Sequence, residues 1–285
     1  MRGELLRDRE PDAARGTGHD GSAAGKVDAV HGTRTIRPLA VLETRDLVKE
    51  FAGFRAVNGV SLTLDDGRIH ALVGPNGAGK TTLFNLLTGF LQPTSGVIRL
   101  FGEDATRLRP DRIARRGVAR SFQITSLFEQ LTVLEHVLLA LQSETGVGMR
   151  FWSGEGALRR FEPRARELLE EVGLASLADR PASSLPYGQK RALEIALALA
   201  LAPRLLLLDE PTAGMSLEDV RRTIDLVQRV RADRTVLLVE HNMGVVAELA
   251  ERVIVMQAGR IIADGPYETV RQDPAVITAY LGQVE

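Results

Sequence analysis

Near the start of the apolar part of the chain, nine consecutive residues have the types and spacing that bind phosphate. They fit the pattern G-x-x-x-x-G-K followed by Ser or Thr, and a strand-like stretch at 69–73 and a helix-like stretch at 82–87 flank them as this pattern requires. Glycines let several backbone N–H groups point at one anion, and the helix N-terminus adds partial positive charge. Lys80 would reach the outer phosphates, and the Thr81 hydroxyl would ligate Mg²⁺. We therefore predict a nucleoside triphosphate site at Gly74, Pro75, Asn76, Gly77, Ala78, Gly79, Lys80, Thr81 and Thr82.

Two adjacent carboxylates, Asp209 and Glu210, follow the all-apolar stretch 205–208. An all-apolar strand is typical of a parallel sheet covered on both faces, and ligands bind at the carboxyl edge of such sheets. Because neighbouring strand residues point in opposite directions, the two acids can do different work. Asp209 would hold Mg²⁺, directly or through water, and Glu210 would orient and deprotonate an attacking water. A chance glycine-rich turn and a solvated strand end remain the alternatives for each pattern taken alone.

Composition sets limits on function. With 285 residues and 44% hydrophobic content, the chain can bury the core of one large domain or of a domain with a subdomain. A formal net charge of −1 implies no surface for a polyanion, so no nucleic-acid partner is expected. The absence of cysteine excludes disulfides, thiolate metal sites and thiol catalysis. No apolar run reaches 18 residues and no secretory signal is apparent, so we expect a cytoplasmic protein that reaches a membrane only through a partner.

The sequence pattern predicts the organisation of the elements. Residues 1–38 lack apolar periodicity and are expected to be a disordered tail, ahead of one domain at 39–285. Strands are predicted at 41–51, 57–64 and 97–101, and helices at 132–142, 163–172 and 188–202, within a helical subdomain at about 124–202. Strand and helix patterns then alternate to the end of the chain. The predicted fold class is α/β, a mostly parallel sheet with an N-terminal antiparallel β part and a helical insertion.

Five motifs in a fixed order resemble those of the ATP-binding subunits of ABC transporters, over about residues 41–282. They are the phosphate loop, Gln123 at the end of 119–123, the signature-like stretch Leu185–Arg191, the motif Asp209-Glu210-Pro211, and His241 after the strand-like stretch 236–239. The resemblance implies a nucleotide-binding domain of the P-loop type with ATP and Mg²⁺ as cofactors.

The resemblance also implies roles for single residues. Phe51 would stack on adenine, although an ordinary core phenylalanine is an equal alternative. Gln123 would contact Mg²⁺ and the attacking water, and His241 would bind the γ-phosphate and hold that water with Glu210. The signature residues Tyr187, Gly188 and Gln189 would contact the nucleotide held by an opposite subunit. Pro186 replaces the serine usual in this family and removes both a hydroxyl and an N–H group, so a weaker half-site is expected.

Finer features resemble importers of branched-chain amino acids. One is the Tyr-Gly-Gln form of the signature, which the stretch 193–196 follows. The others are the glycine-rich stretch 143–160 and the stretches 240–243 and 273–282. Expected partners are a second ATPase subunit of different sequence, two integral membrane permease subunits and an extracytoplasmic solute-binding protein, which together would place the chain at the cytoplasmic face of the membrane. The alternatives are the ATPase subunit of a lipopolysaccharide-type exporter and a weakly hydrolysing regulatory subunit.

Overall fold

The structure is a computed structural model that describes residues 40–121, 127–144 and 160–281. Residues 1–37 and 38–285 form separate units, and every described residue belongs to the second. The predicted N-terminal tail at 1–38 therefore lies outside the described residues, and so does Gln123.

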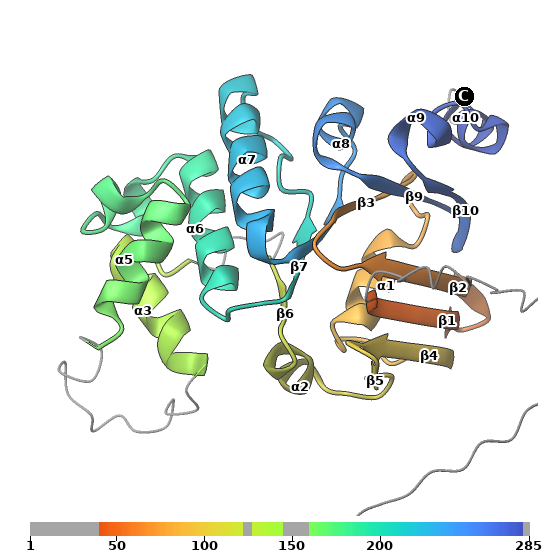
Figure 1. Ribbon diagram of the computed structural model, residues 1–285, viewed down its shortest axis with the longest axis horizontal. Coiled ribbons are helices and arrows are strands. Elements are labelled where there is room, and N and C mark those ends of the chain that lie inside the picture. The colour runs from red at the N-terminus through yellow and green to blue at the C-terminus, as the bar shows by residue number, and fades with distance from the viewer. Residues whose placement is uncertain (1–39, 122–126, 145–159, 282–285) are drawn as a thin grey trace, which may run out of the picture. The chain divides into compact units, whose positions relative to one another are not determined.

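A six-stranded, mostly parallel sheet forms the centre of the described unit (Figure 1). Its order is β10 (Arg260–Gly265), β9 (Arg252–Gln257), β3 (Ile69–Val73), β8 (Thr235–Val239), β7 (Leu205–Asp209) and β6 (Val118–Arg120). Only β10 pairs antiparallel within this sheet. Every residue of β3, β7 and β8 is buried, as expected for strands covered on both faces.

Successive residues of β7 enter different hydrophobic cores. Leu206 and Leu208 pack in the core shared with the helical part of the chain, whereas Leu205 and Leu207 pack in the core shared with the N-terminal strands. This alternation follows from the two-residue period of a strand. It fixes the direction in which the acids at the end of β7 leave the sheet.

A second, antiparallel sheet has the order β2 (Phe54–Asp65), β1 (Ala40–Phe51), β4 (Ser95–Leu100) and β5 (Glu103–Asp104). Ala52 and Gly53 join β1 to β2 with φ angles of 46° and 86°, the left-handed turn that matches the twist of a hairpin. Helix α1 (Lys80–Leu87) packs on β2 through the same core as this sheet. The predicted fold class, a mostly parallel sheet with an N-terminal antiparallel part and a helical insertion, is confirmed.

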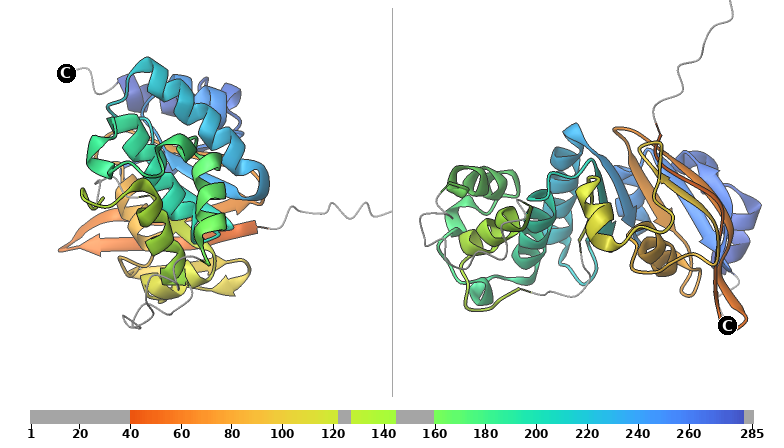
Figure 2. Two further views of the ribbon diagram at one scale, coloured as in Figure 1. Left: turned by 90° about the vertical axis from the view of Figure 1, so that its left-hand side faces the viewer. Right: turned by 90° about the horizontal axis from the view of Figure 1, so that it is seen from below.

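The helical insertion consists, in the described residues, chiefly of α3 (Val133–Glu144), α5 (Glu162–Glu171) and α6 (Tyr187–Leu199). These three helices contact one another and lie side by side in both views of Figure 2. The remaining helices are α2 (Pro110–Arg115), α7 (Leu217–Val230), α8 (Met243–Leu249), α9 (Tyr267–Val270) and α10 (Pro274–Leu281).

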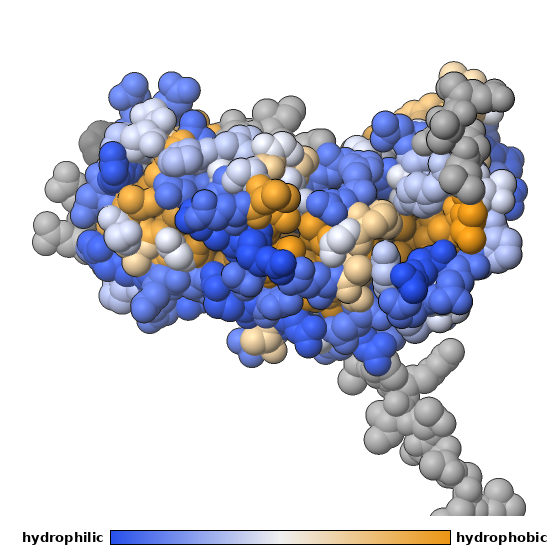
Figure 3. Space-filling model, turned by 90° about the horizontal axis from the view of Figure 1, so that it is seen from above, coloured by the Kyte–Doolittle hydropathy of each residue, from blue (hydrophilic) through white to orange (hydrophobic). Residues whose placement is uncertain are grey.

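The face in Figure 3 is mostly hydrophilic, with apolar side chains visible between the polar ones, including at the end where the C-terminal helices lie. Within the described ranges, no helix has the length and hydrophobicity needed to cross a bilayer.

Candidate active site

The phosphate loop joins β3 to α1 and passes close to the backbone of two other strands. Gly74 has a φ of 149°, and a Cβ atom there would stand 2.1 Å from the carbonyl oxygen of Met256 in β9. Gly79 has a φ of 102°, and a Cβ atom there would stand 2.3 Å from the carbonyl oxygen of Ala56 in β2. Glycine is required at both positions for its backbone angles and for the space that it leaves. The loop is thus held in place by the two sheets that flank it.

The Lys80 ammonium group lies inside this loop. It donates hydrogen bonds to the carbonyl oxygens of Gly74, at 2.7 Å, and Pro75, at 3.0 Å. Burial lowers the pKa of Lys80, and the negative charges of Glu210 and Asp209 oppose that shift. Thr81, the next residue, is exposed in the first turn of α1. A buried cation, an exposed hydroxyl and a helix N-terminus therefore converge on one place, which suits a phosphate group.

A cavity of about 440 Å³ opens beside the loop. The residues that line it come from the loop, the start of β2, the turn after β9, and α10: Phe54, Arg55, Pro75, Asn76, Gly77, Ala78, Gln257, Ala258, Thr278 and Ala279. Phe51 is not among them; it lies half exposed at the hairpin tip, with the Lys49 ammonium 5.0 Å from its ring centroid. Its role against adenine stays a prediction. Phe54, which pairs with Phe51 across the hairpin, was missed because nothing in the sequence distinguishes the two rings.

The C-terminal helix α10 also reaches the loop. Tyr280 makes a hydrogen bond with the backbone of Gly74, and burial raises the pKa of its hydroxyl while that hydrogen bond opposes the shift. Thr278 and Ala279 of the same helix line the cavity. Sequence reasoning assigned no site residue to this helix, because its distance from the phosphate loop along the chain hides the contact.

The structure brings Glu210 and His241 together. The His241 Nε2 atom lies 2.5 Å from the Glu210 Oε1 atom, across the ends of the neighbouring strands β7 and β8. Glu210 has a φ of 47°, an uncommon conformation for a residue other than glycine, and its N–H donates to the carbonyl oxygen of Val239 at 3.0 Å. Such backbone strain is often found at functional sites. Asp209, directly before it, is buried at the end of β7.

Glu240 fixes the two loops that carry this pair. Its Oε1 atom accepts hydrogen bonds from the N–H, at 3.0 Å, and hydroxyl, at 2.7 Å, of Thr212, and its Oε2 atom accepts from the N–H groups of His241, at 3.1 Å, and Asn242, at 3.5 Å. Only 3% of Glu240 is exposed, so its charge depends on these donors. The sequence placed Glu240 beside His241 but gave no sign of this connecting role.

Helix α6 is tied to the acids through Arg191, which is buried. Its guanidinium donates to the carbonyl oxygens of Asp209 and Glu210 and, at 2.7 Å, to the carboxylate of Glu194. Burial raises the pKa of Glu194, and the hydrogen bond from Arg191 opposes that shift. A displacement of α6 would therefore move or break the hydrogen bonds that Arg191 makes with the backbone of Asp209 and Glu210.

Pro186 is the N-cap of α6. The N–H of Lys190 donates to its carbonyl oxygen at 3.0 Å, which leaves Tyr187, Gly188 and Gln189 in the first turn, where N–H groups have no partner within a helix. Tyr187 is exposed. The structure of one chain does not bring these residues into the cavity beside the phosphate loop.

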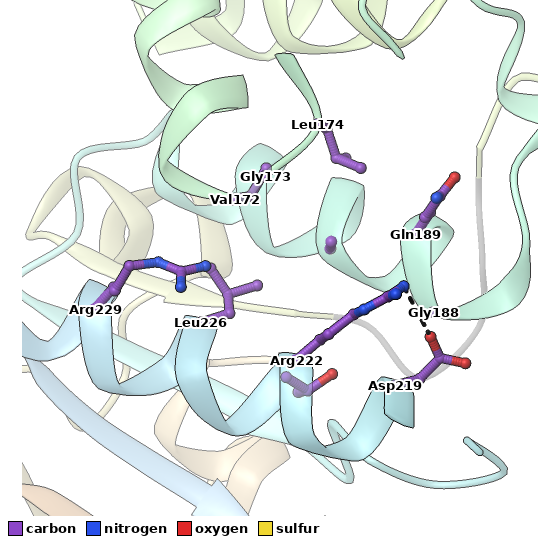
Figure 4. Close-up of a pocket in the computed structure, with 11 residues that line it drawn as sticks. Val172, Gly173, Leu174, Gly188, Gln189, Asp219, Arg222, Leu226 and Arg229 are labelled. Atoms are coloured by element: carbon purple, nitrogen blue, oxygen red, sulfur yellow. Dashed lines mark ion pairs between the residues drawn. The ribbon is translucent and has the colours of Figure 1, made fainter. Parts of the chain in front are cut away.

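Gly188 packs tightly against α7 of the same chain. A Cβ atom at Gly188 would stand 2.8 Å from the carboxyl carbon of Asp219, so a larger residue there would require the Asp219 side chain to move. Ser216 caps α7 by accepting from the N–H of Asp219 at 3.2 Å. Gly188 and Asp219 lie on the wall of a cavity of about 230 Å³, in which Asp219 pairs with Arg222 (Figure 4).

Two family models match the chain. One described as ABC transporter matches residues 57–213, and one described as branched-chain amino acid ATP-binding cassette transporter matches residues 260–285.

Named relatives span almost the whole domain. The chain is 43% identical over 252 residues to the high-affinity branched-chain amino acid transport ATP-binding protein BraF of Pseudomonas aeruginosa, covering 85% of this chain and 98% of that one. It is 40% identical over 252 residues to LivG of Escherichia coli, a protein of the same description, again covering 85% and 98%. A probable LivG of Archaeoglobus fulgidus is 34% identical over 250 residues, covering 86% and 96%.

Solved structures of similar fold are ATP-binding cassettes. A nucleotide-free cassette of an ABC transporter has a TM-score of 0.76 and 31% identity, covering 86% of this chain and 100% of that one. A cassette in its ADP conformation has a TM-score of 0.77 and 31% identity, covering 86% and 99%.

Proposed function

Because the chain belongs to the ATP-binding proteins of ABC transporters, we propose that it is the ATP-hydrolysing subunit of an importer for branched-chain, or other hydrophobic, amino acids. The names of the relatives support this solute class, and so does the match of residues 260–285 to a family named for it. A lipopolysaccharide-type exporter, the alternative drawn from the sequence, has no counterpart among these relatives.

The observation that best supports ATP hydrolysis is the Glu210–His241 pair, together with the Lys80 ammonium group inside the glycine-rich loop. We propose that the Glu210 carboxylate takes a proton from a water molecule, whose oxygen attacks the γ-phosphorus of ATP while the bond to the bridging oxygen of ADP breaks. His241, whose Nε2 atom lies 2.5 Å from Glu210 here, would donate its Nε2–H to the γ-phosphate once ATP is bound, giving up the bond to Glu210. Lys80 would exchange its hydrogen bonds with the Gly74 and Pro75 carbonyl oxygens for hydrogen bonds with phosphate oxygens. Its ammonium group would then have acceptors both before and after ATP binds.

The donors present fit a magnesium ion that arrives with the nucleotide. Among the described residues, no three His, Cys, Asp or Glu side chains are grouped to hold a metal by themselves. Mg²⁺ usually keeps several waters and binds one or two carboxylates plus substrate phosphates, so a full protein cage is not expected. The Thr81 hydroxyl and the Asp209 carboxylate would hold it, and bound Mg²⁺ would neutralise phosphate charge during transfer. Gln123, the other proposed ligand, lies outside the described residues.

The signature residues act, in this proposal, on a nucleotide held by another subunit. Pro186 offers no hydroxyl, so the first-turn N–H groups of α6 and its helix dipole would bind the γ-phosphate. ATP would then favour a closed pair of ATPase subunits, and hydrolysis would reopen it. Shifting such an equilibrium from 1:99 to 99:1 needs roughly 5.5 kcal/mol of differential binding, which two enclosed triphosphates can supply.

The proposed assembly contains a second ATPase subunit of different sequence, two permease subunits and an extracytoplasmic solute-binding protein. The permeases would hold this chain at the cytoplasmic face of the membrane. Membership in the transporter family and the absence of a membrane-spanning helix in the described ranges both agree with this arrangement.

The test is solute-dependent ATP hydrolysis by the complex reconstituted in vesicles with its binding protein. Leucine, isoleucine and valine should each stimulate phosphate release, whereas lysine and glutamate should not. Stimulation that is absent for every amino acid would contradict the solute class. A complex carrying Glu210→Gln in this chain should lose part or all of its activity, and unchanged activity would instead identify the chain as a weakly hydrolysing regulatory subunit.

A further inference from the structure

The last residue of β6, Arg120, places a nearly buried guanidinium between three elements of the site. The Nη1 atom donates to the Oδ1 atom of Asn85 in α1 at 2.6 Å, and the Nη2 atom donates to the Oδ2 atom of Asp209 at 2.7 Å. The guanidinium also lies over the ring of Phe84, 5.5 Å from its centroid. Its side chain is only 11% exposed, and that of Asp209 is 4% exposed. The phosphate-loop helix, the acidic strand and β6 therefore meet at one side chain.

Stability alone is a poor explanation for this arrangement. A buried ion pair loses so much hydration that well-packed apolar residues of similar volume are often as stable. The Nε atom of Arg120 is moreover buried without a hydrogen-bond partner in the described part of the chain. The side chain thus retains an unpaired donor while directing its other two nitrogens at Asn85 and Asp209.

The pairing leaves the two oxygens of Asp209 unequal. Arg120 holds Oδ2, whereas Oδ1 has no hydrogen-bond partner among residues 40–121, 127–144 and 160–281. A carboxylate fixed by one oxygen presents the other in a defined direction, as residues behind metal ligands commonly achieve. Asn85 fixes the Arg120 guanidinium in turn. Its Oδ1 atom accepts from Nη1 of Arg120 while Asp209 accepts from Nη2, so both outer nitrogens of the guanidinium are bound at once.

We propose that Arg120 is a positioning residue that orients Asp209 toward the magnesium ion of MgATP. This inference rests on the proposed function, since it assumes that the site binds that ion with ATP. Lysine cannot replace arginine in this role, because a single ammonium cannot reproduce the planar fork that spans Asn85 and Asp209.

The test compares ATP binding with and without Mg²⁺ by calorimetry on the full chain. Arg120→Lys keeps the charge and removes the fork, so it should weaken binding in Mg²⁺ about 10-fold while leaving metal-free ATP binding unchanged. Asn85→Ala, which removes only the anchor of the guanidinium, should act in the same direction and serves if the first variant does not fold. Arg116→Lys is the matched control, because Arg116 pairs with the exposed Glu103 at the surface.

The outcomes separate this inference from the function on which it rests. Equal binding of MgATP by Arg120→Lys and the parent chain would overturn the positioning role, as would an equal loss with and without Mg²⁺, which marks general damage to the fold. A parent chain whose ATP binding ignores Mg²⁺ would overturn the proposed metal site itself. A melting temperature measured without nucleotide records any purely structural effect.

Discussion

At the scale of single residues, Gly74 and Gly77 give a matched comparison within one loop. Both have positive φ angles, but a Cβ atom at Gly74 would meet a backbone oxygen at 2.1 Å, whereas at Gly77 it would meet nothing within 4 Å. Gly74→Ala should therefore lower the free energy of unfolding by about 3 kcal/mol or more, from overpacking and backbone strain together. Gly77→Ala should cost only its backbone strain, about 1–2 kcal/mol.

Urea denaturation of the two variants checks this difference. Equal losses of unfolding free energy would show that backbone angle alone decides the requirement for glycine in this loop. A larger loss for Gly77→Ala would contradict the close packing of Gly74 against Met256.

At the residue scale, the sequence could single out candidates where the residues that would act together are close along the chain. The phosphate loop and the acids at 209 and 210 carry their own pattern, and the structure places them at the carboxyl ends of β3 and β7, two parallel strands separated by β8. Arg120 and Phe54 were not singled out, because Arg120 contacts residues that are distant along the chain and the sequence does not show that Phe54, rather than Phe51, lines the cavity. The roles assigned to single residues, including Gln123 and Phe51, stay predictions.

At the scale of elements, Glu240 connects the loop after β7 to the start of α8. Glu240→Gln preserves the shape of the side chain but replaces one of its two accepting oxygens with an NH₂ group. That NH₂ group would face a backbone N–H donor, of Thr212 or of His241, and could not accept from it. The free energy of unfolding should fall by about 1–3 kcal/mol. Because the Glu210–His241 pair would lose its alignment, kcat should fall about 10- to 100-fold while ATP affinity changes little.

Steady-state ATP hydrolysis and ATP binding measured on the same preparation test this connection. Glu268→Gln is the control, since that carboxylate is exposed on α9. A Glu240→Gln chain with parental kcat would show that the two loops hold their geometry without the buried carboxylate.

The predicted bounds of helices and strands agree with the structure where the hydrophobic pattern extends over many residues. Predicted helices at 132–142, 163–172 and 188–202 correspond to α3, α5 and α6, and the predicted strands lie at β1, β2, β3 and β4. Four elements of seven residues or fewer, α2, β5, β6 and α8, were not predicted from the sequence. Such short elements show no periodicity, and they depend on the sheet against which they pack.

At the scale of the whole molecule, the residues proposed to act on ATP lie in two separate parts of one chain. The phosphate loop, the acids and His241 gather at the strand ends, whereas the N-terminus of α6 does not line the cavity beside the loop. Arg191 links α6 to the acidic pair within the chain, and in the proposed pairing of subunits this link would connect the signature residues with the acids. We expect hydrolysis to require paired subunits for this reason.

The most direct test of the central claim is phosphate release from MgATP by Glu210→Gln, measured at chain concentrations that favour pairing and alongside ATP binding. The account predicts a rate at least about 100-fold below that of the parent chain, with ATP binding retained, because the general base is lost and the phosphate loop is intact. Glu103→Gln, a change at an exposed carboxylate, should leave both properties unchanged. Phosphate release by Glu210→Gln at the parental rate would contradict the account.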